Sequence, residues 1–196
     1  RHAQLVKDKT EFDQSVGALR IKCLSDIRRS NRDTKVPTTL SCYEQELLLN
    51  MAYLRKETAY TKQLTGISAV IKTRVLTAQQ QLSEAMAAMI DGLESGVYDS
   101  TEQLQGAHAK LRTNYRLPLA LSQEQVRADR AVAWVGFLAQ RTRQLLALKP
   151  ADPVRLMLEE TVSCLTSTVH MVGSIEGAKN YQETKEYFSQ YQSSLA

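Results

Sequence analysis

The stretch ISAVIKTRVLTAQQQLSEAMAAMIDGL, residues 67–93, decides the fold that the sequence predicts. It contains no proline, and an aliphatic residue or methionine returns at every third or fourth position. This spacing places the apolar side chains on one side of an α-helix, where neighbouring helices can bury them. The predicted core and assembly stripe comprises Leu64, Ile67, Ile71, Val75, Leu82, Met86, Met89 and Leu93.

The period of this stripe indicates how the helix packs. Its mean step is close to the ~3.6 residues per turn of a straight helix, rather than the ~3.5 of a supercoiled heptad repeat. Ala69, Val70 and Ile90 widen the apolar surface beyond a narrow seam. We therefore expect a helix that contacts two neighbours in a bundle, although a dimeric coiled coil stays open.

Capping signals predict that this helix is very long. Ser41 stands three residues before Glu44, which is the spacing of a capping box, so the helix is expected to begin near Cys42. No strong breaker is recognised before Gly96, which suits the glycine position after a helix end. The expectation is one helix over about residues 42–95.

Turn-forming residues divide the remainder of the chain, beginning with Asn31, Asp33 and Pro37 after a first amphipathic helix. Pro118 predicts an interruption of the third helical region, and Pro150 with Pro153 predicts another boundary. The abundance of helix-favouring residues and the short connections predict an all-α fold, a single elongated antiparallel bundle of three to five helices over residues 1–196. The predicted loop and breaks are 31–40, 96–100, 117–122 and 149–153.

The cysteines give a weak indication of compartment. Cys23, Cys42 and Cys164 are odd in number and far apart, without a C-x-x-C pair, so neither a disulfide framework nor a zinc site is expected. No N-x-S/T sequon occurs, and no run approaches the ~20 apolar residues that span a bilayer. These observations favour an intracellular, cytoplasmic setting.

The sequence contains no recognisable catalytic or cofactor motif. Its three histidines, His2, His108 and His170, do not occur at ligand spacing, and His108 is expected to be exposed. The repeated Glu-x-x-His pattern of di-iron bundles is absent. We therefore predict a non-enzymatic protein without a metal or cofactor.

Basic residues are candidates for binding an acidic surface. Residues 97–149 hold 8 basic and 4 acidic side chains, whereas residues 150–196 hold 3 and 6, so pairing between these two regions is the leading explanation of the charge. The net charge of +4 is diffuse and disfavours nucleic acid as a partner. The candidates are Arg28, Arg29, Arg32 and Lys35 in the first loop, and Arg127, Arg130, Arg141 and Arg143 further along.

Aromatic side chains are candidates for binding a partner protein, because they supply a large contact area and dominate interface hot spots. Packing in the protein's own core is the alternative for each of them. The candidates are Trp134, Phe137, Tyr181, Tyr187, Phe188 and Tyr191.

The leading hypothesis is a helical scaffold or adaptor that binds other proteins, themselves helical, within a larger intracellular assembly. The second is a BAR-like dimer that binds acidic membranes, since long helices and an arginine-rich region fit such a module. A homodimer is open under either hypothesis. A helical enzyme or ligand carrier is the third class.

Overall fold

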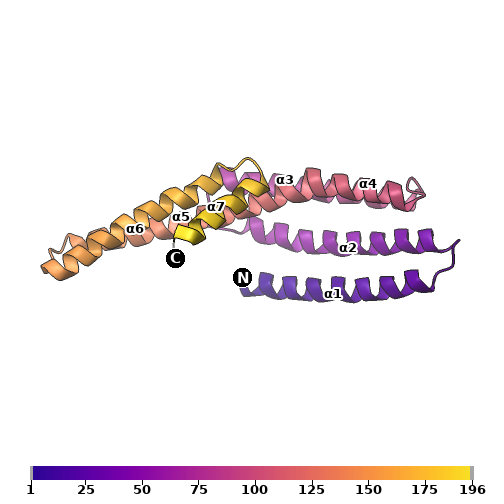
Figure 1. Ribbon diagram of the computed structural model, residues 1–196, viewed down its shortest axis with the longest axis horizontal. Coiled ribbons are helices and arrows are strands. Elements are labelled where there is room, and N and C mark those ends of the chain that lie inside the picture. Colours follow the sequence, from indigo (N-terminus) through magenta and orange to yellow (C-terminus); the bar gives the residue numbers. More distant parts are fainter. Residues whose placement is uncertain (1, 195–196) are drawn as a thin grey trace. The chain divides into compact units, whose positions relative to one another are not determined.

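The computed structural model describes the backbone of residues 2–194, and their side chains except at positions 2, 176, 188 and 190–194. These residues form helices and short connections, and the described range contains no strand (Figure 1). The predicted all-α class is confirmed. The elements are α1 (His2–Arg29), α2 (Lys35–Lys62), α3 (Ala69–Glu94), α4 (Thr101–Leu111), the π-helical turn η1 (Arg112–Arg116), α5 (Leu117–Leu146), α6 (Asp152–Glu176) and α7 (Tyr181–Ser194).

The chain folds as two compact units. The first comprises Arg1–Leu64 and Leu76–Leu119, and the second comprises Thr65–Val75 and Ala120–Ala196. Each unit has buried apolar side chains of its own. The single elongated bundle over residues 1–196 stays a prediction.

The prediction of one helix over residues 42–95 is wrong, because two separate helices, α2 and α3, occupy that range. α2 ends at Lys62, Gly66 has a φ of 73°, and α3 begins at Ala69. Glycine adopts this left-handed conformation readily because it has no Cβ, so Gly66 turns the chain here. The Ser68 Oγ then accepts a hydrogen bond of 3.3 Å from the Ile71 backbone N–H. A very long continuous helical segment lies further along the chain, because α4, η1 and α5 follow one another without a gap from Thr101 to Leu146.

The break predicted over 117–122 is also wrong, and η1 explains why. Proline in a helix lacks an N–H, and its ring clashes with the carbonyl four residues earlier. In the π turn the Leu117 backbone N–H donates to the Arg112 carbonyl, five residues back. This wider turn changes the carbonyl positions just before Pro118, and the chain continues into α5 without a break.

The loop predicted over 31–40 is shorter in the structure, because α2 begins at Lys35. The Asn31 Oδ1 accepts hydrogen bonds from the backbone N–H groups of Asp33 and Thr34, at 3.1 and 2.9 Å. Pro37 falls in the first turn of α2, where no intrahelical partner awaits its missing N–H. Ser41 therefore lies inside the helix and does not cap it.

The other two predicted boundaries are confirmed. Gly96, with a φ of 73°, follows α3, and the Val97 N–H donates to the Gly92 carbonyl at 2.9 Å, which is the bonding of a glycine-terminated helix. The Ser100 Oγ accepts from the Gln103 backbone N–H at 3.3 Å and caps α4. The 149–153 boundary lies between the ends of α5 and α6.

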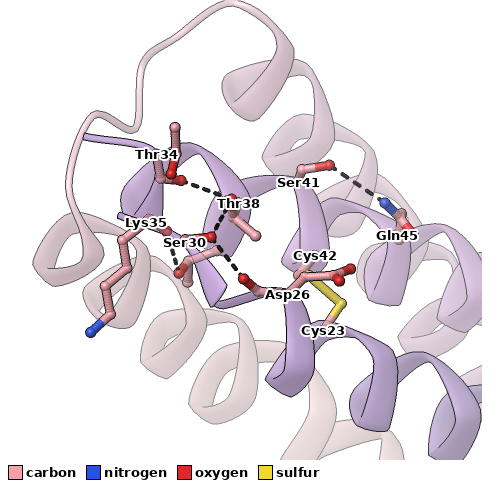
Figure 2. Close-up of a disulfide and its surroundings, with 10 residues drawn as sticks. Cys23, Asp26, Ser30, Thr34, Lys35, Thr38, Ser41, Cys42 and Gln45 are labelled. Atoms are coloured by element: carbon pink, nitrogen blue, oxygen red, sulfur yellow. Dashed lines mark hydrogen bonds between the residues drawn. A yellow bond between two sulfur atoms is a disulfide. The ribbon is translucent and has the colours of Figure 1, made fainter. Parts of the chain in front are cut away.

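A disulfide joins the first two helices, contrary to the sequence expectation. α1 and α2 form an antiparallel hairpin, which brings Cys23 and Cys42 to a Cα–Cα distance of 5.8 Å (Figure 2). The spacing of the cysteines in the sequence did not reveal this pair. Cys23 and Cys42 become neighbours only because the hairpin places residues on either side of its turn next to each other. Cys164 remains an exposed free thiol. The cysteine argument for a reducing compartment is thereby removed.

The hydroxyl groups beside this disulfide connect the two ends of the turn. The Ser30 Oγ donates to the Asp26 carbonyl at 2.8 Å and lies 3.1 Å from the Thr38 Oγ1 (Figure 2). The Thr38 Oγ1 in turn donates to the Thr34 carbonyl at 2.8 Å. Both local hydrogen bonds and a covalent bond therefore fix the α1–α2 turn.

Candidate interaction surface on α5

Five side chains on α5 form one exposed line, which we name the α5 stripe. Its members follow one another by steps of three or four residues, so they lie on the same face of the helix. Trp134 is 61% exposed and Phe137 is 45% exposed, and the arginines are exposed as well. The stripe consists of Arg127, Arg130, Trp134, Phe137 and Arg141.

Another face of α5 builds the core of the second unit. Ala128 of α5 is 1% exposed and packs with Val172 and Ile175 of α6. Val132 of α5 and Tyr187 of α7 pack against the same cluster. The helix thus completes a core while Trp134 and Phe137 stay outside it. The alternative prediction, that Trp134 packs in the protein's own core, is therefore wrong.

The aromatic rings of the stripe contact each other. Trp134 and Phe137 stack with their ring centroids 5.8 Å apart and their planes at 24°. The guanidinium of Arg141 lies over the Phe137 ring, 5.3 Å from its centroid. Such ring and cation–π contacts each contribute about 0.5–1.5 kcal/mol and restrict rotamers. The stripe is therefore partly ordered before anything binds to it.

A shallow groove of about 600 Å³ runs beside the aromatic pair. It is lined by the turn at Thr65 and Gly66 that precedes α3, and by Val126 and Ala133 of α5. A Cβ at Gly66 would meet open space, so the turn does not fill the groove. The sequence did not reveal this turn, because Gly66 was not recognised as a helix breaker.

Polar contacts hold the turn before α3 in place. The Asp129 carboxylate of α5 accepts a hydrogen bond from the Ser68 backbone N–H in the turn. The Arg74 Nη1 donates to the Gln125 Oε1 at 2.8 Å, and the Gln125 Nε2 donates to the Ala178 carbonyl at 3.3 Å. Gln125 is 1% exposed, so its amide links α3, α5 and the α6–α7 connection inside the unit.

Among the described residues, the stripe's arginines have one acidic partner, which belongs to Arg127. Arg127 pairs with Glu124 of the same helix at 2.7 Å. The Arg141 Nη1 donates to the neutral Gln144 side chain, and Arg130 forms no ion pair with a described residue. No ion pair between described residues joins this stripe to an acidic side chain of α6 or α7, and the pairing of the basic and acidic regions stays a prediction.

The two groups of basic residues belong to different units. Arg28, Arg29, Arg32 and Lys35 are exposed around the α1–α2 turn of the first unit. In the second unit, Arg143 is exposed on another side of α5, two residues beyond Arg141. The structure thus joins Arg127, Arg130 and Arg141 with the aromatic pair and leaves Arg143 off the stripe.

The remaining candidates divide between core and surface. Ile71, Val75, Leu82, Met86 and Met89 are buried as expected. Leu93 is half-buried, as are Leu64 and Ile67 in the turn between α2 and α3. Tyr181 and Tyr187 are also half-buried, and the side chains of Phe188 and Tyr191 lie outside the described part of the chain.

A tyrosine–histidine pair in the first unit was not anticipated. The Tyr43 Oη lies 2.6 Å from the Nδ1 of His108, which is half-buried rather than exposed. Burial raises the pKa of Tyr43 to about 12 and lowers that of His108 below its usual value. Both groups are therefore neutral near pH 7, and the tautomer of His108 determines which of them donates. Within the described residues, no three His, Cys, Asp or Glu side chains converge as metal ligands would.

No protein-family model, curated protein or solved structure matches the chain. Among the described residues, no helix has the combination of length and apolar character that crossing a membrane requires. The assignment of function therefore rests on the chain's own surfaces, and on the α5 stripe a groove, exposed aromatics and charge without an acidic partner coincide.

Proposed function

We propose that this chain is a non-enzymatic helical scaffold or adaptor module that binds another protein by docking a helix against α5, as part of a larger assembly. The observation that carries the proposal is the stacked Trp134–Phe137 pair, which is exposed although the core beneath α5 is complete without it. Tryptophan and arginine are enriched in interface hot spots, and both are present here.

The exposed pair offers a useful binding energy. Trp and Phe each bury about 150–250 Å² in a core, so the exposed parts of this pair present on the order of 200 Å² together. Covering that area stabilises a complex by about 5 kcal/mol before the entropy of association is subtracted. This is the scale of a hot spot at the centre of an interface.

Site-specific photo-crosslinking in the native cell tests the proposal. A benzophenone amino acid replaces Phe137 in one variant and the exposed Ser163 of α6 in a matched control. We expect a discrete protein adduct from position 137 that is absent from position 163 and is lost on adding Trp134→Ala. Equal adducts at both positions, or none at position 137, would refute the proposal.

A second candidate function, binding to an acidic membrane surface, is favoured by exposed residues in and after the connection between α5 and α6. Leu148 is 77% exposed and Met157 is 66% exposed, and Lys149 lies between them in sequence. Aliphatic side chains beside a cation suit the interface of an anionic bilayer. Sedimentation with phosphatidylserine vesicles tests this function, and wild-type pelleting no greater than that of Leu148→Asp would exclude it.

The intracellular location stays a prediction, and the Cys23–Cys42 disulfide opposes it, because disulfides persist mainly in oxidising compartments. Trapping the thiols of cells with an alkylating agent before lysis gives the state of this pair in its own compartment. Two reduced thiols would support the cytoplasmic prediction, whereas an intact disulfide would contradict it.

A further inference from the structure

From the arrangement of charge on the α5 stripe we infer the chemistry of the docked segment: an amphipathic helix with carboxylates on either side of an apolar centre. This inference rests on the proposed function and adds to it the class of partner. Arg130 and Arg141 stand on opposite sides of Trp134 and Phe137 along the helix. The partner therefore needs negative charge at two places and an apolar anchor between them.

The spacing of these four residues specifies the partner's pattern. The steps Arg130 to Trp134, Trp134 to Phe137 and Phe137 to Arg141 are four, three and four residues. Arg130 and Arg141 are thus about 16 Å apart along the axis, at 1.5 Å per residue. A partner helix with acidic residues at i and i+11, and large apolar residues at i+4 and i+7, matches every position. Because the pattern is the same in both directions, a parallel or an antiparallel partner satisfies it.

Unsatisfied charge favours an acidic occupant over an uncharged one. Arg130 has no acidic partner among the described residues, whereas Arg127 is already paired with Glu124. The Arg141 guanidinium lies over the Phe137 ring and donates to a neutral amide, so its charge also has no acidic partner among the described residues. Charge-assisted bonds from arginine to carboxylates are directional, so they add orientation as well as attraction.

The form of the site favours a helix over a bilayer or nucleic acid. Thr65 and Gly66 line the shallow groove together with the aromatic pair, so a rounded helix contacts more of this lining than a flat bilayer does. Arg127 is already ion-paired with Glu124, so the stripe offers two separate cations, Arg130 and Arg141, rather than the continuous positive row that a run of phosphates requires. A single helix, about 10 Å across, presents discrete carboxylates at the two arginines.

The single tryptophan of the chain, Trp134, reports directly on this site. We would titrate the full chain with two synthetic helical peptides, both with leucines at i+4 and i+7, one with glutamates and one with lysines at i and i+11. The acidic peptide is expected to shift Trp134 emission to shorter wavelength and to bind at least tenfold more tightly than the lysine peptide. Raising the salt concentration should narrow this preference.

Charge reversal provides the decisive comparison. The variant Arg130→Glu with Arg141→Glu should prefer the lysine peptide, whereas Arg28→Glu with Arg29→Glu, which changes the net charge equally in the other unit, should keep the wild-type preference. All four substituted side chains are exposed, and far-UV circular dichroism checks that helix content is retained. A restored pairing between the reversed stripe and the lysine peptide would support the inference strongly.

The contrary outcomes are distinct. If both peptides bind the wild type equally, or neither does, the acidic-helix inference is overturned, while a Phe137-specific crosslink would still leave the proposed function standing. If phosphatidylserine vesicles alone shift Trp134 emission, the occupant is a lipid surface and the inference is likewise overturned. If the Phe137 crosslink is absent and neither peptide binds, both the proposed function and the acidic-helix inference are rejected.

Discussion

Reduction of the Cys23–Cys42 disulfide should lower the stability of the first unit by a calculable amount. The two residues are 19 positions apart in sequence, and the bond closes a loop of about that length around the α1–α2 turn. In the chain-entropy treatment, closing such a loop in the unfolded chain is worth about 3 kcal/mol at 25 °C. Reduction leaves the folded hairpin in place and restores this freedom to the unfolded state.

The assay compares urea unfolding of the oxidised and reduced protein, followed by far-UV circular dichroism. The free energy of unfolding should fall by about 3 kcal/mol on reduction, with little change in helix signal before the transition. The double variant Cys23→Ala with Cys42→Ala should resemble the reduced wild type. Cys164→Ser is the matched control and should unfold like the oxidised wild type, because Cys164 is an exposed free thiol.

Two results would refute the reasoning at different steps. Alkylation of the unfolded, unreduced protein should modify one thiol and, after reduction, three; modification of three before reduction would show that the pair is not bonded. An intact pair whose reduction leaves the unfolding free energy unchanged would show instead that the α1–α2 turn persists in the unfolded chain, so that the bond removes no freedom from it.

Three further predictions concern backbone, pH and surface. Gly96 has a φ of 73° and Lys149 a φ of 52°, and both angles favour glycine. In urea titrations, Gly96→Ala should therefore lower the free energy of unfolding by about 1 kcal/mol, and Lys149→Gly should raise it by about 0.5–1 kcal/mol. Burial lowers the pKa of His108. The contribution of the neutral imidazole to the free energy of unfolding is therefore complete above about pH 6.5, and it decreases as the pH falls through the lowered pKa. His108→Gln should flatten this acid part of a plot of melting temperature against pH. Trp134→Ala should change the free energy of unfolding by about 1 kcal/mol or less, whereas Met86→Ala, at a site 1% exposed, should lower it by about 2–5 kcal/mol. Thermal unfolding measures both variants. An equal loss of stability from the two substitutions would show that Trp134 is a core residue.

Periodicity predicted the helices and most of the core, because apolar spacing determines which side of a helix can be buried. Ile71, Val75, Leu82, Met86 and Met89 are buried as that argument requires. The helix ends were harder to predict, since each depends on a local competition among signals. Pro37 and Pro118 predict helix breaks, yet the first lies in an initial turn and the second follows a π turn.

The candidate site was predictable by residue type but not by arrangement. The sequence predicts Trp134 and Phe137 as binding aromatics, and Arg127, Arg130 and Arg141 as binding cations, on separate grounds. Their common spacing on one helix was present in the sequence and could have united them. Their exposure was not readable in this way, because it depends on the core formed by Ala128 with α6, which requires tertiary packing.

Gly66 connects the error in the fold with the missing part of the site. A helix continuing through this position would have carried its side chains straight past the region beside α5, and no turn would have bordered the stripe. The left-handed glycine ends that helical direction, and the Asp129 contact to Ser68 holds the resulting turn against α5. The same conformational freedom that divides the predicted long helix therefore places Thr65 and Gly66 in the lining of the groove. For this chain, locating a helix end and locating the candidate binding surface are one physical problem.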